Sequence, residues 1–323
     1  MAINNTLVVG TIGYGVFRSE NDGKDWDRSN FTTGLPFGTR VYYLVSHPST
    51  PEVVFAGTDY GLARSDDAGR RWQLLDNPLQ QYSVWALAID PEEPEVMFAG
   101  TSQGCLFRSP DGGKSWEQRP VEVAKECMNV GVPRTTAVAI DPANRDHIWM
   151  SIEVDGFRRS LDRGETWTTV EVRNPDGHDV KVSAGAPHTV LLMSNADLYT
   201  SSDDGATWKE THAREAFPYT FCRNLTVQPG HPQVIFLGHG QGVPGDTGCL
   251  LRSRDSGHTW EPIYLTPEPN SSMWTVAVHA ADPDLMYANS LFGYVYRSDN
   301  GGDSWEKLRR ELSEIRSLLW IPS

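Results

Sequence analysis

The sequence has few cysteines, no excess of basic residues and no long apolar run. Its 323 residues contain four cysteines, too few and too scattered for a disulfide framework in a chain of this size, so we expect reduced thiols. The 42 acidic side chains outnumber the 28 basic ones, and the formal charge is −14. This charge argues against a nucleic acid or an acidic membrane as partner. No stretch approaches the roughly 18 apolar residues that a membrane-spanning helix requires.

The N-terminal residues MAINNTLVVGT do not have the pattern of a signal peptide, because no basic segment precedes a sustained apolar core. We therefore expect a cytoplasmic protein. An exported protein whose targeting segment has been removed is the alternative.

One motif, Ser-x-Asp-x-Gly-x-x-Trp, recurs seven times, with Asn replacing Asp in two copies. The copies lie at Ser19–Trp26, Ser65–Trp72, Ser109–Trp116, Ser160–Trp167, Ser201–Trp208, Ser253–Trp260 and Ser298–Trp305. Their tryptophans are 46, 44, 51, 41, 52 and 45 residues apart. A period of this length indicates a repeat architecture. Because the copies fill the chain, we expect one domain over residues 1–323.

Short β-rich segments accompany each copy. In the second repeat they are RVYYLVSHP (40–48), VVFAGT (53–58), GLARS (61–65) and RWQLL (71–75). Four short strands separated by Pro, Gly and Asp turns are typical of one propeller blade. We therefore predict an all-β fold, a seven-bladed β-propeller of four-stranded antiparallel blades.

The two ends of the chain predict how the ring closes. The first repeat starts at TLVVGT, which matches the second strand of the other repeats, so its first strand is missing. The C-terminal EIRSLLWIP (314–322) matches that missing strand. We expect blade 1 to be shared between about 6–29 and 314–322, which removes an exposed sheet edge.

The recurring motif resembles the Asp-box, or BNR repeat, and the chain is similar to Asp-box β-propellers throughout its length. The resemblance implies that each box lies on the hairpin between the third and fourth strands, away from the ligand face. The residue types fit a structural role, because Asp accepts hydrogen bonds from turn N–H groups, Gly permits positive φ and Trp packs into the blade. A functional role for Asp67 or Asp111 is the less favoured alternative.

The first residues of the inner strands are expected to surround a central pocket. When these strands are aligned on the proline that follows them, or on its equivalent, the residues six positions before it are Tyr42, Trp85, Thr136, Lys181, Arg223, Trp274 and Arg316. Eight positions before it stand Arg40, Ser83, Arg134 and Asp179. Arginine binds carboxylate, sulfate or phosphate through two parallel hydrogen bonds, and aromatic faces suit sugar rings. We therefore predict that an anionic or carbohydrate-like ligand binds to Arg40, Tyr42, Trp85, Arg134, Lys181, Arg223, Trp274 and Arg316. The alternative is that the arginines only pair with acidic neighbours.

The hairpins between second and third strands supply the catalytic candidates. Glu153 and Asp155 stand where the second and third repeats share A-G-T-x-x-G. Two carboxylates at i and i+2 beside a pocket are suited to acid–base catalysis. They could equally form salt bridges with Arg134, Arg158 or Lys181.

Two elaborations lengthen the loops on the expected pocket face. GHGQGVPGDTGC (238–249) contains five glycines, and we interpret it as a mobile lid that carries His239, Gln241 and Asp246. His239 and Gln241 therefore join the predicted ligand-binding set. PVEVAKECMNVGVP (120–133) lengthens the connection into blade 4.

No spacing of histidines and cysteines forms a recognised ligand set, so we predict neither a metal nor a cofactor. A convergence of His178, His239, Cys127, Cys222 and Cys249 near the mouth is the open alternative. Cys222 and Cys249 are interpreted as small buried hydrophobes.

The resemblance implies several functional classes. Sialidases have six blades and a Phe/Tyr-Arg-Ile-Pro start, both absent here, which argues against a classical sialidase. Xyloglucan-active glycosidases use two tandem propellers with one catalytic carboxylate from each, and sortilin-like receptors have ten blades. Assembly factors resembling the photosystem II stability protein are closest in size and blade number, and they also have an arginine-rich patch.

Two hypotheses follow. The first is a soluble propeller that binds an anionic or carbohydrate-like ligand in its central pocket and hydrolyses it, as a glycosidase does, through Glu153 or Asp155. The second is a non-catalytic assembly scaffold that holds a protein segment on the same face. Neither a nucleic acid nor a membrane is expected as partner.

Overall fold

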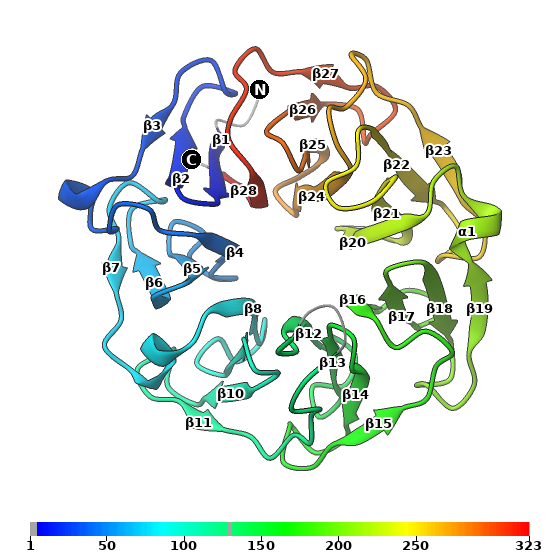
Figure 1. The fold of residues 1–323 in the computed structure, drawn as a ribbon. Helices are drawn as coiled ribbons and strands as arrows, with labels where there is room; N and C mark the ends of the chain where they lie inside the picture. The colour runs from blue at the N-terminus through cyan, green and yellow to red at the C-terminus, as the bar shows by residue number, and fades with distance from the viewer. Residues whose placement is uncertain (1–4, 128–130, 323) are drawn as a thin grey trace.

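The computed structural model describes residues 5–127 and 131–322, which form seven four-stranded antiparallel sheets in a ring (Figure 1). This confirms the predicted seven-bladed β-propeller. Among the described residues no helix is long and apolar enough to cross a membrane. Helix is confined there to the 3-10 turns Phe31–Thr33 and Pro78–Gln81 and to α1 (Ala213–Ala216).

Each blade runs from an inner strand at the ring axis to a short outer strand at the rim (Figure 1). Blade 1 contains β28 (Ile315–Pro322), β1 (Asn5–Thr11), β2 (Gly15–Ser19) and β3 (Asp27–Arg28); blade 2 contains β4 (Val41–Ser46), β5 (Val54–Thr58), β6 (Gly61–Ser65) and β7 (Gln73–Leu74); blade 3 contains β8 (Val84–Ile89), β9 (Met97–Thr101), β10 (Leu106–Ser109) and β11 (Glu117–Gln118); blade 4 contains β12 (Thr135–Ile140), β13 (Ile148–Ile152), β14 (Gly156–Ser160) and β15 (Thr168–Val170). Blade 5 contains β16 (Gly177–Ser183), β17 (Thr189–Ser194), β18 (Asp197–Ser201) and β19 (Lys209–His212); blade 6 contains β20 (Phe221–Gln228), β21 (His231–Gly240), β22 (Gly248–Ser253) and β23 (Glu261–Ile263); blade 7 contains β24 (Met273–His279), β25 (Asp282–Ser290), β26 (Val295–Ser298) and β27 (Glu306–Lys307).

The C-terminal strand closes the ring as predicted. β28 pairs antiparallel with β1, with Val8 opposite Leu319, and it is the inner strand of blade 1. The buried Trp320 donates its indole N–H to the carbonyl of Leu285 in blade 7, at 3.1 Å. The last strand is therefore hydrogen-bonded to β1 in blade 1 and continues covalently from blade 7, so it links the first blade to the last.

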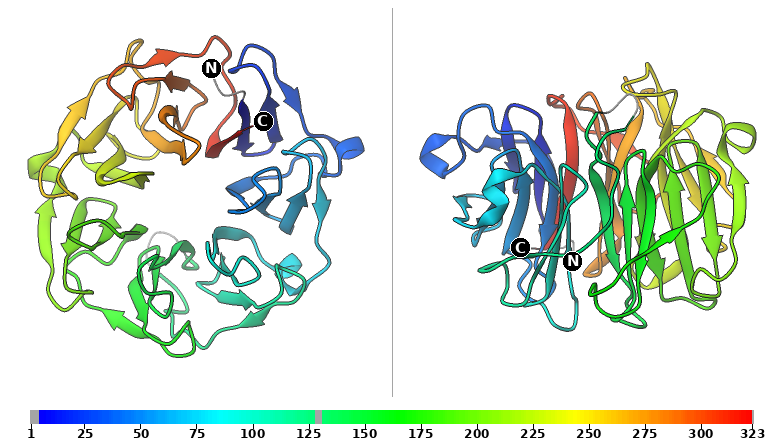
Figure 2. Two further views of the ribbon diagram at one scale, coloured as in Figure 1. Left: turned by 180° about the vertical axis from the view of Figure 1, so that it is seen from behind. Right: turned by 60° about the horizontal axis from the view of Figure 1, so that its bottom comes forward.

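The apolar core is divided into clusters that lie between neighbouring blades. Side chains alternate across each strand, so one strand contributes to two clusters. In β1, Leu7 packs with Leu285 of blade 7, whereas the adjacent Val8 packs with Val41 of blade 2. Seen from the side, the strands run through the thickness of the ring, which leaves the connecting loops on its two faces (Figure 2).

The Asp-boxes form the hairpins between third and fourth strands, as the resemblance implies. In blade 4, Gly164 N–H donates to Ser160 Oγ (2.8 Å), Thr166 N–H donates to Asp162 Oδ1 (2.8 Å) and the Trp167 indole donates to the Gly164 carbonyl (3.1 Å). Hydrogen bonds from Thr166 lower the pKa of Asp162 to about 2. The boxes are therefore structural turns, and sequence analysis missed only that their fourth residue also adopts a positive φ, as Asp204 does at 55°.

Candidate functional site

A pocket of about 240 Å³ lies at the ring axis. All seven inner strands contribute to its lining, because their first residues face the axis where the blades converge. Six of the predicted ligand-binding residues line it: Tyr42, Trp85, Lys181, Arg223, Trp274 and Arg316. The sequence therefore located this pocket, and the binding roles of these residues stay predictions.

The strand register corrects one position of the sequence alignment. Ile140 of β12 pairs with a residue of β13 that in turn pairs with the box serine of blade 4. Val182 of β16 is connected to the box serine of blade 5 in the same way, so Ile140 and Val182 occupy equivalent positions. Four residues before them stand Thr136 and His178. The blade 5 equivalent of Thr136 is thus His178 and not Lys181. The alignment failed because the proline after Val182 comes three residues later than the proline after Ile140.

The other predicted binding residues lie outside the lining. Arg134 is at the mouth, with its guanidinium 4.5 Å from the centre of the Trp85 ring, which in turn stacks on Tyr42 at 4.0 Å. Arg40 is exposed, and its backbone N–H donates to Asp59. His239 and Gln241 belong to blade 6 and do not reach the pocket.

We call Arg134 and Lys181, from blades 4 and 5, the paired arc of the mouth, because each of these cations has a carboxylate partner. Arg134 forms an ion pair with Glu153, and Lys181 Nζ lies 2.9 Å from Asp179 Oδ1. Burial lowers the pKa of Lys181, but the attraction of Asp179 outweighs it, so this pKa is raised. Asp179 itself is buried and also accepts the backbone N–H of Leu225 at 2.7 Å.

We call Arg223, Trp274 and Arg316, from blades 6, 7 and 1, the stacked arc. Both guanidinium groups lie over the Trp274 ring, at 4.5 Å from its centre for Arg223 and 4.7 Å for Arg316. Arg316 Nε donates to Glu314 Oε1 at 2.6 Å. Arg223 forms neither an ion pair nor a hydrogen bond with any described residue, although it is partly buried and lines the pocket. The stacked arc therefore holds one guanidinium without a direct carboxylate partner, which Glu153 and Asp179 attract only at longer range.

The environment of Arg223 opposes its charge. Burial first, and then repulsion from Arg316, lowers the pKa of Arg223 to about 10, so the group stays protonated at neutral pH. The neighbouring His178 is neutral, because burial and then Arg223 lower its pKa to about 3. Its Nδ1 lies 2.7 Å from the carbonyl of Cys222 and donates to it. An anion in the pocket would relieve the repulsion between the two arginines.

Both predicted catalytic carboxylates form salt bridges with arginines, which is the alternative that the sequence left open. Both lie in the hairpin between β13 and β14; Glu153 pairs with Arg134, and Asp155 Oδ2 lies 2.7 Å from Arg158 Nη2 and accepts the Ala124 N–H at 3.0 Å. Neither lines the pocket. Sequence analysis missed Asp176, whose pKa is raised by burial and then by repulsion from Glu153.

The loop that was expected to be a lid is fastened to blade 7. Residues 241–247 connect β21 to β22, and Ser272 Oγ donates to the carbonyl of Gly242 at 2.6 Å. Thr247 Oγ1 donates to Glu268 at 2.6 Å. In the other elaboration, 120–133, residues 128–130 lie outside the described residues, and Cys127 pairs with Gly131 through two backbone hydrogen bonds.

Among the described residues, no group of histidines and cysteines at the mouth is arranged as a metal site. His239 is fully buried in blade 6, where its Nε2 accepts the Tyr219 N–H at 2.9 Å and its Nδ1 lies 3.6 Å from Cys222 Sγ. Burial raises the pKa of the Cys222 thiol and raises that of Cys249 to about 12. Both cysteines are packed in the apolar core between blades 5 and 6, as predicted for small hydrophobes.

Curated relatives of the chain include both enzymes and an assembly factor. A xyloglucanase from Acetivibrio thermocellus is 25% identical over 333 aligned positions, which cover 82% of this chain and 38% of that protein. The photosystem II assembly lipoprotein Ycf48 of a Synechococcus species is 25% identical over 142 positions, 43% of this chain and 39% of that protein. The chain thus spans well under two thirds of these relatives.

Solved structures share the fold at low identity. A GH74 xyloglucanase from Xanthomonas campestris has a TM-score of 0.65 at 17% identity, covering 99% of this chain and 52% of that chain. A structure of YCF48 bound to D1 peptide has a TM-score of 0.58 at 16% identity, covering 83% and 81%. At these identities the likeness shows the propeller fold alone.

Two family models match the sequence. The model described as sortilin, neurotensin receptor 3, matches residues 196–318, and the model described as photosynthesis system II assembly factor YCF48, a BNR-repeat family, matches residues 64–228. The second match covers just over half of the chain. The protein therefore belongs to the YCF48 family of BNR-repeat propellers.

Proposed function

We propose that this propeller is a non-catalytic binding protein that holds a carboxylate-bearing segment of another protein in its central pocket. The observation that carries the proposal is Arg223, a partly buried guanidinium that lines the pocket and forms no ion pair with any described residue. Buried charges in proteins are ordinarily paired, so an unpaired one in a pocket is suited to a ligand of opposite charge.

The stacked arc suits a carboxylate in particular. Both guanidinium groups lie over the Trp274 ring, and this contact favours one orientation of each before any ligand arrives. A pre-oriented guanidinium can bind both oxygens of a carboxylate through parallel N–H bonds. Because the protein has a net charge of −14, this local positive site selects where an anionic segment binds.

The comparisons favour a protein segment as the bearer of the carboxylate. One solved member of the same fold is a YCF48 bound to D1 peptide, and the family model that covers half of this chain is that of YCF48. A small free anion would use the same arginines, so the test must separate the two sources.

A glycosidase-like activity through Glu153 and Asp155 is supported less well. Each carboxylate is engaged by an arginine, and the chain covers 38% of the xyloglucanase that it resembles. Hydrolysis would have to release at least one of these ion pairs.

The test is an array of decapeptides, in which each acidic peptide is printed beside a matched peptide with Gln for Glu, Asn for Asp and a C-terminal amide. We expect the wild-type protein to prefer the acidic member at least tenfold, Arg223→Gln to lose that preference and Arg40→Gln to keep it. Arg40 is the matched control, because it is an exposed arginine of the same face that does not line the pocket.

Three results would contradict the proposal. They are equal binding to both members of each pair, an unchanged preference in Arg223→Gln, or cleavage of xyloglucan oligosaccharides that is lost in Glu153→Gln. If glutarate alone saturates the pocket and no peptide competes with it, the ligand is a small anion rather than a protein segment.

A further inference from the structure

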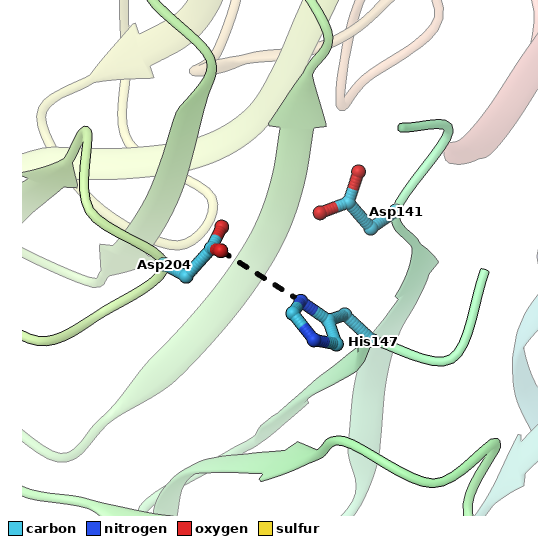
Figure 3. Close-up of side chains that lie close together, drawn as sticks. All are labelled: Asp141, His147 and Asp204. Atoms are coloured by element: carbon cyan, nitrogen blue, oxygen red, sulfur yellow. Dashed lines mark ion pairs between the residues drawn. The ribbon is translucent and has the colours of Figure 1, made fainter. Parts of the chain in front are cut away.

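A second group of polar side chains converges on the face opposite the pocket mouth, where blades 4 and 5 meet. Asp141 follows β12, His147 precedes β13, and Asp204 belongs to the box of blade 5. One donor atom from each lies within 4.8 Å of the other two. Figure 3 shows the two carboxylates and the imidazole ring directed toward the space between them.

The fold does not require a histidine at position 147. The second strand of each blade contains one residue that pairs with the box serine of the third strand. We compare the residue that comes directly before it in the sequence. This residue is His147 in blade 4, and its equivalents are Thr6, Val53, Val96, Thr189, Val234 and Leu285. Because Val serves three other blades here, the imidazole of His147 has no evident packing role.

His147 also has an unused buried nitrogen. Its Nε2 lies 3.1 Å from the side-chain amide of Asn144, but its Nδ1 is buried without a hydrogen-bond partner among the described residues. Nδ1 lies 4.0 Å from Asp204 Oδ2. That separation is too long for a hydrogen bond. It is wider by about 0.6 Å than the ~3.4 Å between two ligands of a tetrahedral ion with bonds of ~2.0–2.2 Å, so a small movement of the half-exposed Asp204 side chain would bring both atoms to one ion.

The two carboxylates are held in place by a second histidine. His188 Nε2 lies 2.9 Å from Asp141 Oδ2, and its Nδ1 lies 3.3 Å from Asp204 Oδ1. The other oxygen of Asp141 accepts the N–H groups of Ala143 and Asn144. Partners that orient ligands in this way are a regular feature of metal sites.

A second group of two carboxylates and one histidine shows the arrangement when an arginine occupies such a cluster. Asp197, Glu210 and His212 have the same composition, but the guanidinium of Arg173 lies among them, at 2.9 Å, 2.6 Å and 2.7 Å. At the junction of blades 4 and 5 no described arginine or lysine pairs with Asp141 or Asp204; Arg159 donates only to the backbone carbonyl of Asp204.

We propose that Asp141, His147 and Asp204 bind one divalent transition-metal ion of the zinc class, with His188 as positioning residue. The imidazole favours Zn²⁺ over Ca²⁺ and Mg²⁺, which prefer all-oxygen ligands. Two carboxylates balance the charge of the ion, and three protein ligands leave one position for water. Asp204 is half exposed, which gives the ion an entry path. The ion would join blade 4 to blade 5 and stabilise the folded ring.

The test measures Zn²⁺ binding to chelator-treated protein by calorimetry and by thermal unfolding. We expect one Zn²⁺ per chain and a rise in unfolding temperature in the wild type. His147→Val, the residue of blades 2, 3 and 6, should weaken Zn²⁺ binding at least tenfold and abolish the rise. His212→Ala, from the cluster that Arg173 fills, should leave both unchanged.

Asp204→Ala provides a second variant, because blade 2 already carries Ala68 at this box position with a positive φ. It too should weaken Zn²⁺ binding at least tenfold. The proposal is overturned if either variant binds Zn²⁺ as the wild type does, if His212→Ala loses the site, or if Ca²⁺ or Mg²⁺ binds there as tightly as Zn²⁺.

Discussion

The two arcs of the pocket mouth place their cations in opposite surroundings. In the paired arc, Arg134 and Lys181 each have a carboxylate within reach, so their charges are compensated inside the protein. In the stacked arc, Arg223 has an aromatic ring and a second arginine beside it, and no described acid forms an ion pair with it. The comparison teaches that the presence of arginine at a pocket says little about function until its partners are known.

The difference has an energetic meaning. A pKa of about 10 for Arg223, against an ordinary 12.5, means that the fold disfavours this charge by about 3 kcal/mol. A compensated cation does not carry this penalty. We infer that the stacked arc is kept for a ligand, because the attraction of Glu153 and Asp179 offsets only part of the penalty on the Arg223 charge.

The largest expected effect is on stability in acid. The pKa of His178 is lowered to about 3 and that of His239 to about 4, in both cases mainly by burial. The unfolded chain takes up these protons below its ordinary pKa of 6.5, whereas the folded protein does not. Stability is therefore full above pH 6.5 and falls as the pH drops, by about 2 kcal/mol for each histidine at pH 5.

Chemical denaturation at pH 7 and pH 5 checks this loss. Because burial is the largest cause of the lowered pKa of His178, Arg223→Gln should keep nearly all of this acid loss. A free energy of unfolding that is flat between these two pH values would contradict the assignment of both histidines as neutral.

The next largest effect is on anion binding. Arg223→Gln removes the uncompensated charge and should weaken glutarate binding by about 2–3 kcal/mol, a typical value for a charged hydrogen-bonded pair. Arg134→Gln, on the paired arc, should change glutarate affinity by less than about 0.5 kcal/mol, because Glu153 already compensates Arg134. Calorimetry at constant salt measures both, and equal losses in the two variants would remove the distinction between the arcs.

Glu153→Gln should leave Arg134 without its carboxylate partner. With its partner neutral, Arg134 becomes available to an anion, and glutarate affinity should rise by about 1 kcal/mol. A hydrolase that uses Glu153 would instead lose turnover in this variant. The same titration therefore sharpens the comparison and separates the two functional hypotheses.

The smallest expected effect is a gain in stability. Arg223→Gln removes a charge that the fold disfavours by about 3 kcal/mol. It also loses the stacking on Trp274, which contributes about 0.5–1 kcal/mol, and it leaves a partly buried amide without a partner, which costs ~1 kcal/mol. We expect a net stabilisation of the free protein by about 1 kcal/mol, measured by urea unfolding at pH 7. Destabilisation of the same size would mean that Arg223 serves the fold rather than a ligand.

Repetition within the sequence accounts for what could be predicted. Seven copies of the box gave blade number, strand order and the closure by 314–322, because each copy supports the interpretation of the others. The alignment erred at blade 5, where the position belongs to His178. A proline marks a turn, but hydrogen bonds between strands set the register, and these are not visible in one sequence.

The partners of the charged side chains could not be predicted. Arg134 and Arg223 look alike in the sequence. Of the two, only Arg134 forms an ion pair with Glu153, which lies just beyond the β12–β13 pair. Likewise His147 and Asp204 are more than fifty residues apart and meet only because blades 4 and 5 are neighbours in the ring. Such contacts depend on blade packing rather than on local pattern.

The most direct test of the central claim is a titration of the side-chain Nε–H signals of arginine by NMR, with glutarate as the ligand. Arg223→Gln and Arg134→Gln assign the two signals. The Arg223 signal should shift in a saturable way as glutarate is added, while the Arg134 signal stays in place. A saturable shift of Arg134 with Arg223 unmoved would contradict the central claim.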